Sequence, residues 1–124
     1  MDASSVPNLR IPGALAAAFV RGVGRFSDIE IRKSAWTRYP AFFLNDREIC
    51  HFHSGRELDF RLTRPVLLRF KGVLEQDGRL IPRRNRSHWI AFAFHSPSDL
   101  EAALDLFGLA RDANLQDLRS HPTS

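Results

Sequence analysis

Two histidines one residue apart, His51 and His53, are the side chains best suited to chemistry in this 124-residue sequence. They lie in the stretch REICHFHSGRELDFRL, residues 47–62, and Asp59 follows them there. Imidazole groups bind metal ions and carry protons near neutral pH, and a carboxylate can join either task. The stretch therefore indicates metal ligation or acid–base catalysis, whereas a solvent-facing hairpin surface is the simpler interpretation.

Alternating polar and apolar residues predict that this stretch forms two antiparallel strands. Successive side chains of a strand point to opposite faces of the sheet, so one face of the hairpin is apolar. The residues expected to face the core are Cys50, Phe52, Leu58, Phe60 and Leu62. Those expected on the opposite face are Ile49, His51, His53, Glu57, Asp59 and Arg61.

The register of this hairpin follows from keeping both apolar rows on one face of the sheet. A loop of residues 54–56 satisfies that condition, and Gly55 is expected to supply a left-handed backbone conformation within it. The predicted cross-strand pairs are His53 with Glu57, His51 with Asp59, and Ile49 with Arg61.

The polar face of the hairpin brings groups that can react within reach of one another, because cross-strand neighbours lie about 4.5 to 5.5 Å apart at Cβ. His51, His53 and Asp59 are the candidate catalytic residues, with a histidine acting as base and Asp59 orienting it. The same three residues are the candidate ligands if a metal binds, although nothing in the sequence requires one. Candidate substrate-binding residues are Glu57, Arg61 and Trp89.

The remaining periodicities predict an α+β domain. Helices are expected from Pro12 to about residue 22, from Thr63 to about residue 75, and from Ser96 or Ser98 to about residue 110. Strands are expected over residues 28–36, 41–44, 47–53, 57–62 and 87–94. The order α-β-β-β-β-α-β-α favours an antiparallel sheet of about five strands with helices packed on one face.

The strand SHWIAFAF, residues 87–94, is expected to lie centrally in that sheet. Its Trp89, Ala91 and Ala93 share one face by alternation, and its other face is apolar. The two alanines could form the floor of a shallow pocket on the open face, with Trp89 beside it.

Length and composition fit a single domain over residues 1–124, with a core of about residues 10–118 and frayed ends. The most apolar segment, GALAAAFVRGVG, is too short to cross a membrane and does not resemble a secretory signal, so a cytoplasmic protein is expected. Cys50 is the sole cysteine, which excludes an intramolecular disulfide and a cysteine-based zinc cluster.

The basic charge of the chain, +4 with a pI near 10.2, comes almost entirely from arginine. The arginines are scattered along the sequence, and the one local cluster is RLIPRRNR, residues 79–86. A nucleic-acid-binding domain usually concentrates its positive charge on one face, so a nucleic-acid partner is not favoured.

The segments NDREICHFHSGRELDFRLTRPVLLRF and SHWIAFAFHSPSDLEAALDLFGLA, together spanning roughly residues 41–110, resemble the luciferase-like domain of small uncharacterised bacterial proteins and of fungal luciferases. The matching positions are Arg47, Glu48, Ile49, His51, His53, Gly55, Leu58, Asp59, Trp89 and Asp99. The resemblance implies that His51, His53 and Asp59 are a polar group shared by that family. It does not imply light emission, because a shared fold does not transmit a reaction.

Two functions follow from the sequence. The first is an oxygen-dependent or hydrolytic acid–base enzyme that acts on a small aromatic or acyl molecule at the His-x-His and Asp59 face. The second is a non-catalytic module that uses the open sheet face to bind a small ligand or to form a homo-oligomer. The sequence identifies no cofactor.

Overall fold

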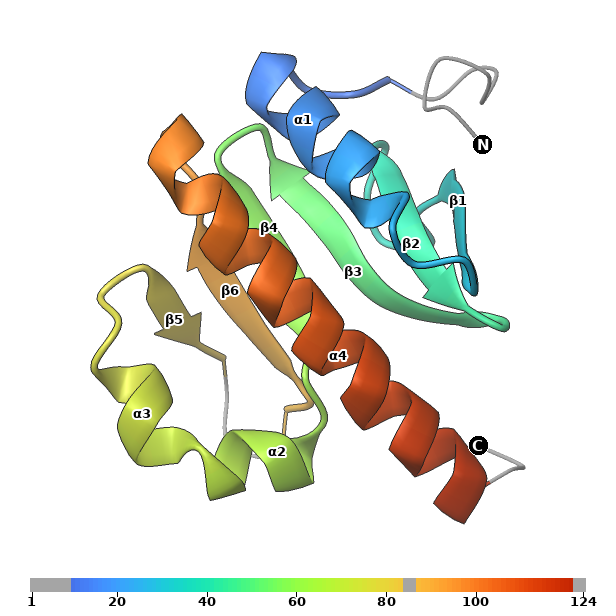
Figure 1. Ribbon diagram of the computed structural model, residues 1–124, viewed down its shortest axis with the longest axis vertical. Coiled ribbons are helices and arrows are strands. Elements are labelled where there is room, and N and C mark those ends of the chain that lie inside the picture. Colours follow the sequence, from blue (N-terminus) through green and yellow to red (C-terminus); the bar gives the residue numbers. More distant parts are fainter. Residues whose placement is uncertain (1–9, 84–86, 122–124) are drawn as a thin grey trace.

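The computed structural model describes residues 10–83 and 87–121, and in this part of the chain helices cover one face of an antiparallel sheet (Figure 1). Most of the two terminal segments, and residues 84–86 of the arginine-rich cluster, lie outside the described residues. The elements in chain order are α1 (Ala14–Val23), β1 (Ile29–Lys33), β2 (Pro40–Leu44), β3 (Arg47–Ser54), β4 (Glu57–Arg61), α2 (Arg64–Arg69), α3 (Lys71–Glu75), β5 (Leu80–Pro82), β6 (Trp89–Ala93), the 3-10 helix η2 (Pro97–Asp99) and α4 (Leu100–Ser120).

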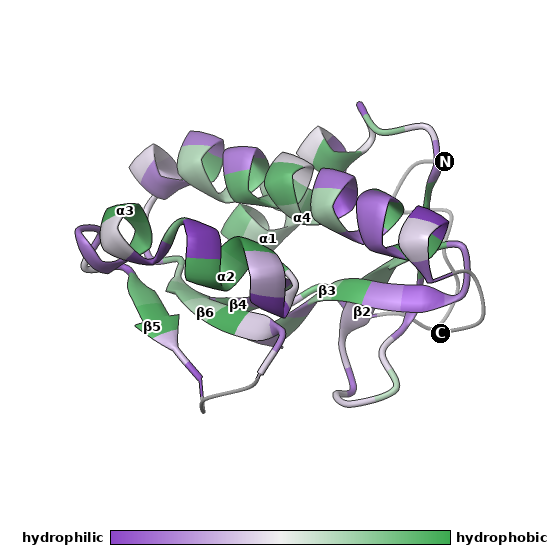
Figure 2. Cartoon of the chain, turned by 90° about the horizontal axis from the view of Figure 1, so that it is seen from below, coloured by the Kyte–Doolittle hydropathy of each residue, from purple (hydrophilic) through white to green (hydrophobic). Residues whose placement is uncertain are grey.

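The six strands pair in the order β1-β2-β3-β4-β6-β5, and every neighbouring pair is antiparallel. The predicted α+β class is therefore confirmed, with α1 and the long α4 packed side by side over one face of the sheet (Figures 1 and 2). The sheet has one strand more than the sequence indicated. This strand, β5, is only three residues long and lies at the edge, where its short mixed sequence carries no alternation.

The side of the sheet that faces the helices is built around Phe19 of α1, which is fully buried. Its ring makes edge-on contacts with five other phenylalanines at centroid distances of 5.4 to 6.2 Å. These partners come from β2, β3, β4, the end of β6, and α4, and they are Phe42, Phe52, Phe60, Phe94 and Phe107. Edge-to-face packing suits the ring quadrupoles, so this cluster fixes the position of the helices on the sheet.

No helix in the described residues is both long enough and apolar enough to cross a membrane.

The helix expected after Thr63 differs in detail from its prediction. It is divided at Phe70 into α2 and α3, neither of which has a fully buried residue. Thr63 occupies the N-cap position with φ 74°, but its hydroxyl makes no capping hydrogen bond. Nδ1 of His88 instead accepts a hydrogen bond from the backbone N–H of Arg64 at 2.9 Å and so caps the start of α2. The last helix is also longer than expected and ends at Ser120.

The β3–β4 hairpin keeps the predicted pairing of His51 with Asp59 but has a shorter turn than predicted. Glu57 pairs with Ser54 and not with His53, because a bulge between Phe52 and Ser54 takes His53 out of the ladder. The expectation for Gly55 was also wrong, since its φ is not positive. A Cβ atom at Gly55 would lie 2.7 Å from the carbonyl oxygen of Pro12, so close backbone approach is what requires glycine here.

We predict that Gly55→Ala lowers the free energy of unfolding by about 1 to 3 kcal/mol, the usual effect of forcing one extra carbon into a packed site. The matched control is Gly78→Ala, because a Cβ atom at Gly78 meets no atom within 4 Å. The control should change stability by no more than about 0.5 kcal/mol. Urea denaturation of the two variants measures the difference, and equal effects would contradict the steric explanation.

Candidate functional site

The centre of the candidate site is His51, whose imidazole lies between two carboxylates. Its Nδ1 is 2.8 Å from Oε2 of Glu48, and its Nε2 is 2.9 Å from Oδ2 of Asp59. All three residues are less than a tenth exposed. An ionised carboxylate only accepts hydrogen bonds, so both contacts are satisfied when His51 carries a proton on each nitrogen. The arrangement is therefore an imidazolium held between two anions.

A bulge in β3 places Glu48 on the same face as His51. Phe42 pairs with Cys50 and Phe43 pairs with Glu48, which leaves Ile49 as an extra residue in the strand. A bulge shifts the alternation by one residue, so Glu48 points away from the core. The prediction that Ile49 lies on the polar face opposite Arg61 was wrong for this reason, because Ile49 belongs to the buried apolar cluster.

The loop between β1 and β2 holds the other side of Glu48. The hydroxyl of Ser34 donates to Oε2 at 2.7 Å, and the backbone N–H of Ala35 donates to Oε1 at 2.8 Å. Both oxygens of Glu48 are thus engaged, and Ser34 is itself buried. This carboxylate is an anchor for His51, and its burial leaves little of it accessible to a ligand.

Arg83 holds the second oxygen of Asp59. Its Nη2 atom donates to Oδ1 of Asp59 at 2.6 Å and to Oε2 of Glu57 at 3.0 Å. Arg83 follows β5, whereas both acids lie on β4, so its side chain reaches across the intervening β6. Ala91 of β6 pairs with Asp59 on one side and with Ile81 on the other. Its small side chain leaves room for the Arg83 side chain to cross β6.

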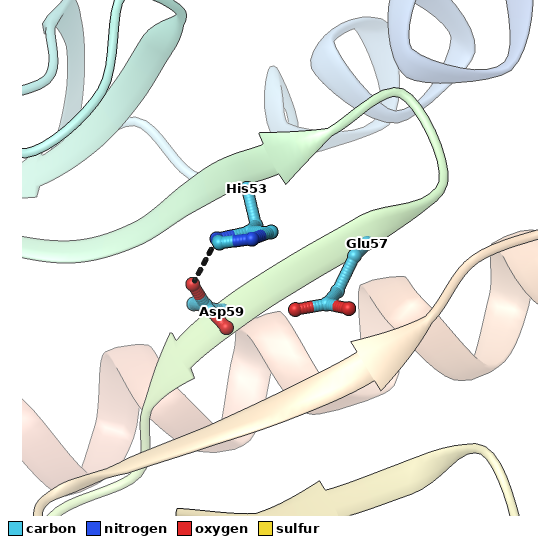
Figure 3. Close-up of side chains that lie close together, drawn as sticks. All are labelled: His53, Glu57 and Asp59. Atoms are coloured by element: carbon cyan, nitrogen blue, oxygen red, sulfur yellow. Dashed lines mark ion pairs between the residues drawn. The ribbon is translucent and has the colours of Figure 1, made fainter.

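His53 is the accessible histidine of the site, with a side chain 58% exposed. Its Nδ1 lies 3.8 Å from Oδ2 of Asp59, and Glu57 lies beside the two (Figure 3). One possible ligand atom from each of His53, Glu57 and Asp59 falls within 4.8 Å of the others, a spacing that fits a cation. Arg83 already bonds both carboxylates, so a metal there would compete with its guanidinium. The metal ligands predicted from the sequence were His51, His53 and Asp59. They differ from this group, which contains Glu57 in place of His51.

The pKa values of the three buried groups are shifted in the directions that keep them charged. Burial lowers the pKa of His51, but hydrogen bonds to Asp59 and Glu48 outweigh it and raise that pKa above 6.5. Burial raises the pKa of Glu48, but hydrogen bonds from His51 and Ser34 lower it overall. For Asp59 the hydrogen bonds from His51 and Arg83 likewise outweigh burial and lower the pKa.

The structure brings most of the predicted substrate-binding residues to this face, but it does not bring Arg61. Trp89 stacks beside His51, with ring centroids 4.9 Å apart and planes inclined by 37°. Glu57 joins the polar cluster, which consists of Glu48, His51, His53, Asp59 and Arg83, through its ion pair with Arg83. The guanidinium of Arg61 instead donates to Oδ1 of Asn114 in α4 at 2.6 Å, and Asn114 donates back to the carbonyl of Arg61.

A cavity of about 400 Å³ adjoins the cluster. Residues of α2, α3, β5 and β6, with the segments that flank the two strands, line it. Arg83 and Trp89 connect the cavity to the cluster. Each of them lines the cavity, and Arg83 contacts Asp59 while Trp89 contacts His51. The volume lies within the range of small-molecule sites in proteins.

Sequence reasoning did not identify Glu48 and Arg83 as members of the site. For Glu48 a signal was present, because regular alternation would have placed a carboxylate in the core beside Cys50 and Phe52. Burying an unpaired charge there is costly, so that conflict indicates a bulge. Arg83 had no comparable signal, since its reach depends on the pairing of β5.

Comparison with protein families gives one match. Residues 46–110, just over half of the chain, match the family model described as Luciferase domain, which confirms the resemblance seen in the sequence. The matched segment contains every member of the cluster except the β1–β2 loop residues that anchor Glu48. Searches of curated proteins and of solved structures each gave no significant match.

We predict that His51→Gln lowers the free energy of unfolding by about 3 to 5 kcal/mol near pH 6, because it leaves Glu48 buried without its cation and leaves Asp59 with Arg83 alone. His51 has a raised pKa, so its contribution is complete below 6.5 and decreases as the pH rises through the folded-state value. Glu48 and Asp59 have lowered pKa values, so their contribution is present above 4.5 and lost in acid. The stability difference between wild type and variant should therefore be largest between pH 4.5 and 6.5.

Chemical denaturation at a series of pH values measures this difference, with His53→Gln as the control. His53 is mostly exposed, and its replacement should change stability by no more than about 0.5 kcal/mol. A His51→Gln effect that stays constant from acid to alkaline pH would show that His51 is not held as an imidazolium.

Proposed function

The chain belongs to the luciferase domain family, and we propose that within it the protein is an enzyme that performs acid–base chemistry on a small organic molecule. The observation that supports this proposal is the buried array Glu48–His51–Asp59, which lies next to the exposed imidazole of His53. Buried ionisable groups with opposed pKa shifts are costly to a fold and concentrate at functional sites.

The two histidines take different roles in this proposal. His51 has both ring nitrogens engaged, so it is a positioning residue that fixes the carboxylate of Asp59. His53 is the general base, because its ring is accessible and Asp59 stands near its Nδ1. The present 3.8 Å separation is longer than a hydrogen bond, and such catalytic contacts often tighten only when substrate binds. The negative charge of Asp59 then stabilises the imidazolium that forms on His53.

The substrate, a small aromatic or acyl molecule, would bind in the cavity beside Trp89 and Arg83 and extend past Arg83, so that its reacting group reaches His53. The proton that His53 removes comes from one of two sources. If it comes from the substrate, the resulting carbanion or enolate can react with molecular oxygen. If it comes from water, the hydroxide attacks an acyl carbon, the bond from that carbon to the leaving alcohol or amine breaks, and His53 returns the proton to the leaving group. Membership of the family does not indicate which of these two reactions occurs, because one fold supports many chemistries.

A binding or dimerisation module is the second candidate, and Trp36 is the observation that favours it. This side chain is 74% exposed on the β1–β2 loop, the same loop that anchors Glu48. Exposed tryptophan is enriched at protein interfaces. In this alternative a second copy of the chain covers the open face, and sedimentation of wild type and Trp36→Ser would show a dimer for the wild type alone.

We predict that His53→Gln lowers kcat by about 100-fold or more with little change in KM, since a positioned base contributes roughly that factor. The substrate is found by incubating wild type with a panel of small aromatic and acyl compounds, in air and under nitrogen, and following each compound by mass spectrometry. Turnover only in air identifies the oxygen-dependent reaction, and turnover in both identifies hydrolysis.

The matched control is His95→Gln, because His95 is an exposed histidine beyond the end of β6, and in the described part of the chain its ring has no hydrogen bond or ion pair with the cluster. It should retain the wild-type kcat. Equal rates in His53→Gln and His95→Gln would remove His53 from the mechanism.

A further inference from the structure

The cavity beside the cluster has an apolar interior. Ile90 at its base is 3% exposed, and Leu67 and Leu74 are partly buried where they pack against the core. Leu68, which is 63% exposed, lies where the lining meets solvent. The interior therefore suits the apolar part of an organic molecule.

The exposed part of the lining carries the cations Arg64 and Lys71 and one carboxylate, Glu75. Arg64 begins α2, and Lys71 begins α3 seven residues later, which places both on the same side of the helix pair as Leu67 and Leu74. Among the residues that the structure describes, no carboxylate pairs with Arg64. Lys71 has only a loose contact with Glu75 at 3.9 Å, with both side chains more than half exposed. An exposed pair of this kind contributes little stability.

The third cation of the lining, Arg83, is already neutralised. Its guanidinium is bound to Asp59 and Glu57, and the same residue lines the cavity. The positive charge that remains for a ligand therefore comes from Arg64 and Lys71. One cation without a partner and one loosely paired cation complement a single negative charge.

We propose that this cavity binds an amphipathic carboxylate, with the apolar part against Leu67, Leu74 and Ile90 and the carboxylate between Arg64 and Lys71. The inference deepens the proposed function and rests on it only for turnover, since binding can be measured separately. A ligand in this position lies against Trp89, whose ring also stacks on His51. Binding is thereby connected to the array that fixes Asp59.

The test uses Trp89 as the reporter. The chain has two tryptophans, and Trp36 lies on the loop after the opposite edge strand, so Trp36→Phe leaves Trp89 as the only source of tryptophan fluorescence. This background protein is titrated with octanoate, 1-octanol and octylamine, which have the same chain length and different head groups. Octanoate should bind about tenfold more tightly than 1-octanol, because charge-assisted hydrogen bonds of about 1.5 kcal/mol correspond to that factor.

The preference for octanoate should disappear in Arg64→Gln/Lys71→Gln. It should persist in Arg69→Gln/Arg119→Gln, which removes the same net charge from exposed positions outside the lining. Equal binding of octanoate and 1-octanol, tighter binding of octylamine, or an equal loss in both double variants would overturn anion recognition. Absence of any fluorescence change with all three compounds would overturn the cavity as the binding place.

This inference and the proposed function can fail separately. His53→Gln in the Trp36→Phe background should bind octanoate as tightly as the background protein, because His53 does not line the cavity. Intact octanoate binding without turnover of any compound by wild type would count against the proposed function alone. Turnover of a panel compound by a protein that shows no preference for octanoate would count against this inference alone.

Discussion

His51 donates one hydrogen bond to Glu48 and one to Asp59, and this pair of bonds connects the other contacts of the charged array on the open face of the sheet. The bond to Glu48 connects β3 to the β1–β2 loop through Ser34. The bond to Asp59 connects β3 to β4, and Arg83 continues the connection to the segment after β5. Negative and positive groups alternate along this path, so each buried charge has a partner of opposite sign. That alternation explains how a domain of this size tolerates several ionised groups beneath its surface.

The apolar packing that stabilises the domain is concentrated on one face of the sheet, which leaves the other face for polar groups. The phenylalanine cluster around Phe19 fills the space between the sheet and the helices α1 and α4. Figure 2 shows the helices α1 and α4 on one side of the sheet, and the charged array lies on the opposite face. A stable core on one side allows polar groups on the other side to be arranged for chemistry, at a local cost in stability that the core can bear.

The parts of this molecule that alternation controls could be predicted from the sequence, and the parts that irregular backbone controls could not. The α+β class and the pairing of His51 with Asp59 follow from regular periodicity, and both are present in the structure. The bulge at Ile49 breaks the periodicity and brings in Glu48, so a rule based on alternation placed the wrong side chain on the polar face. Arg83 reaches the site because the three-residue edge strand β5 pairs with β6. No local pattern in the sequence indicates that pairing.

The spacing of His51 and His53 is that of two ligands for one metal, but the environments of the two rings separate their tasks. Trp89 and the two carboxylates enclose His51, whereas the bulge at the end of β3 leaves His53 in solvent. A metal bound by both rings would have to remove His51 from two hydrogen bonds and leave Glu48 buried without its cation. A metal bound instead by His53 and Asp59 would have to displace Arg83, whose guanidinium already provides positive charge at that carboxylate. A fixed imidazolium beside an accessible imidazole therefore fits proton transfer better than metal ligation.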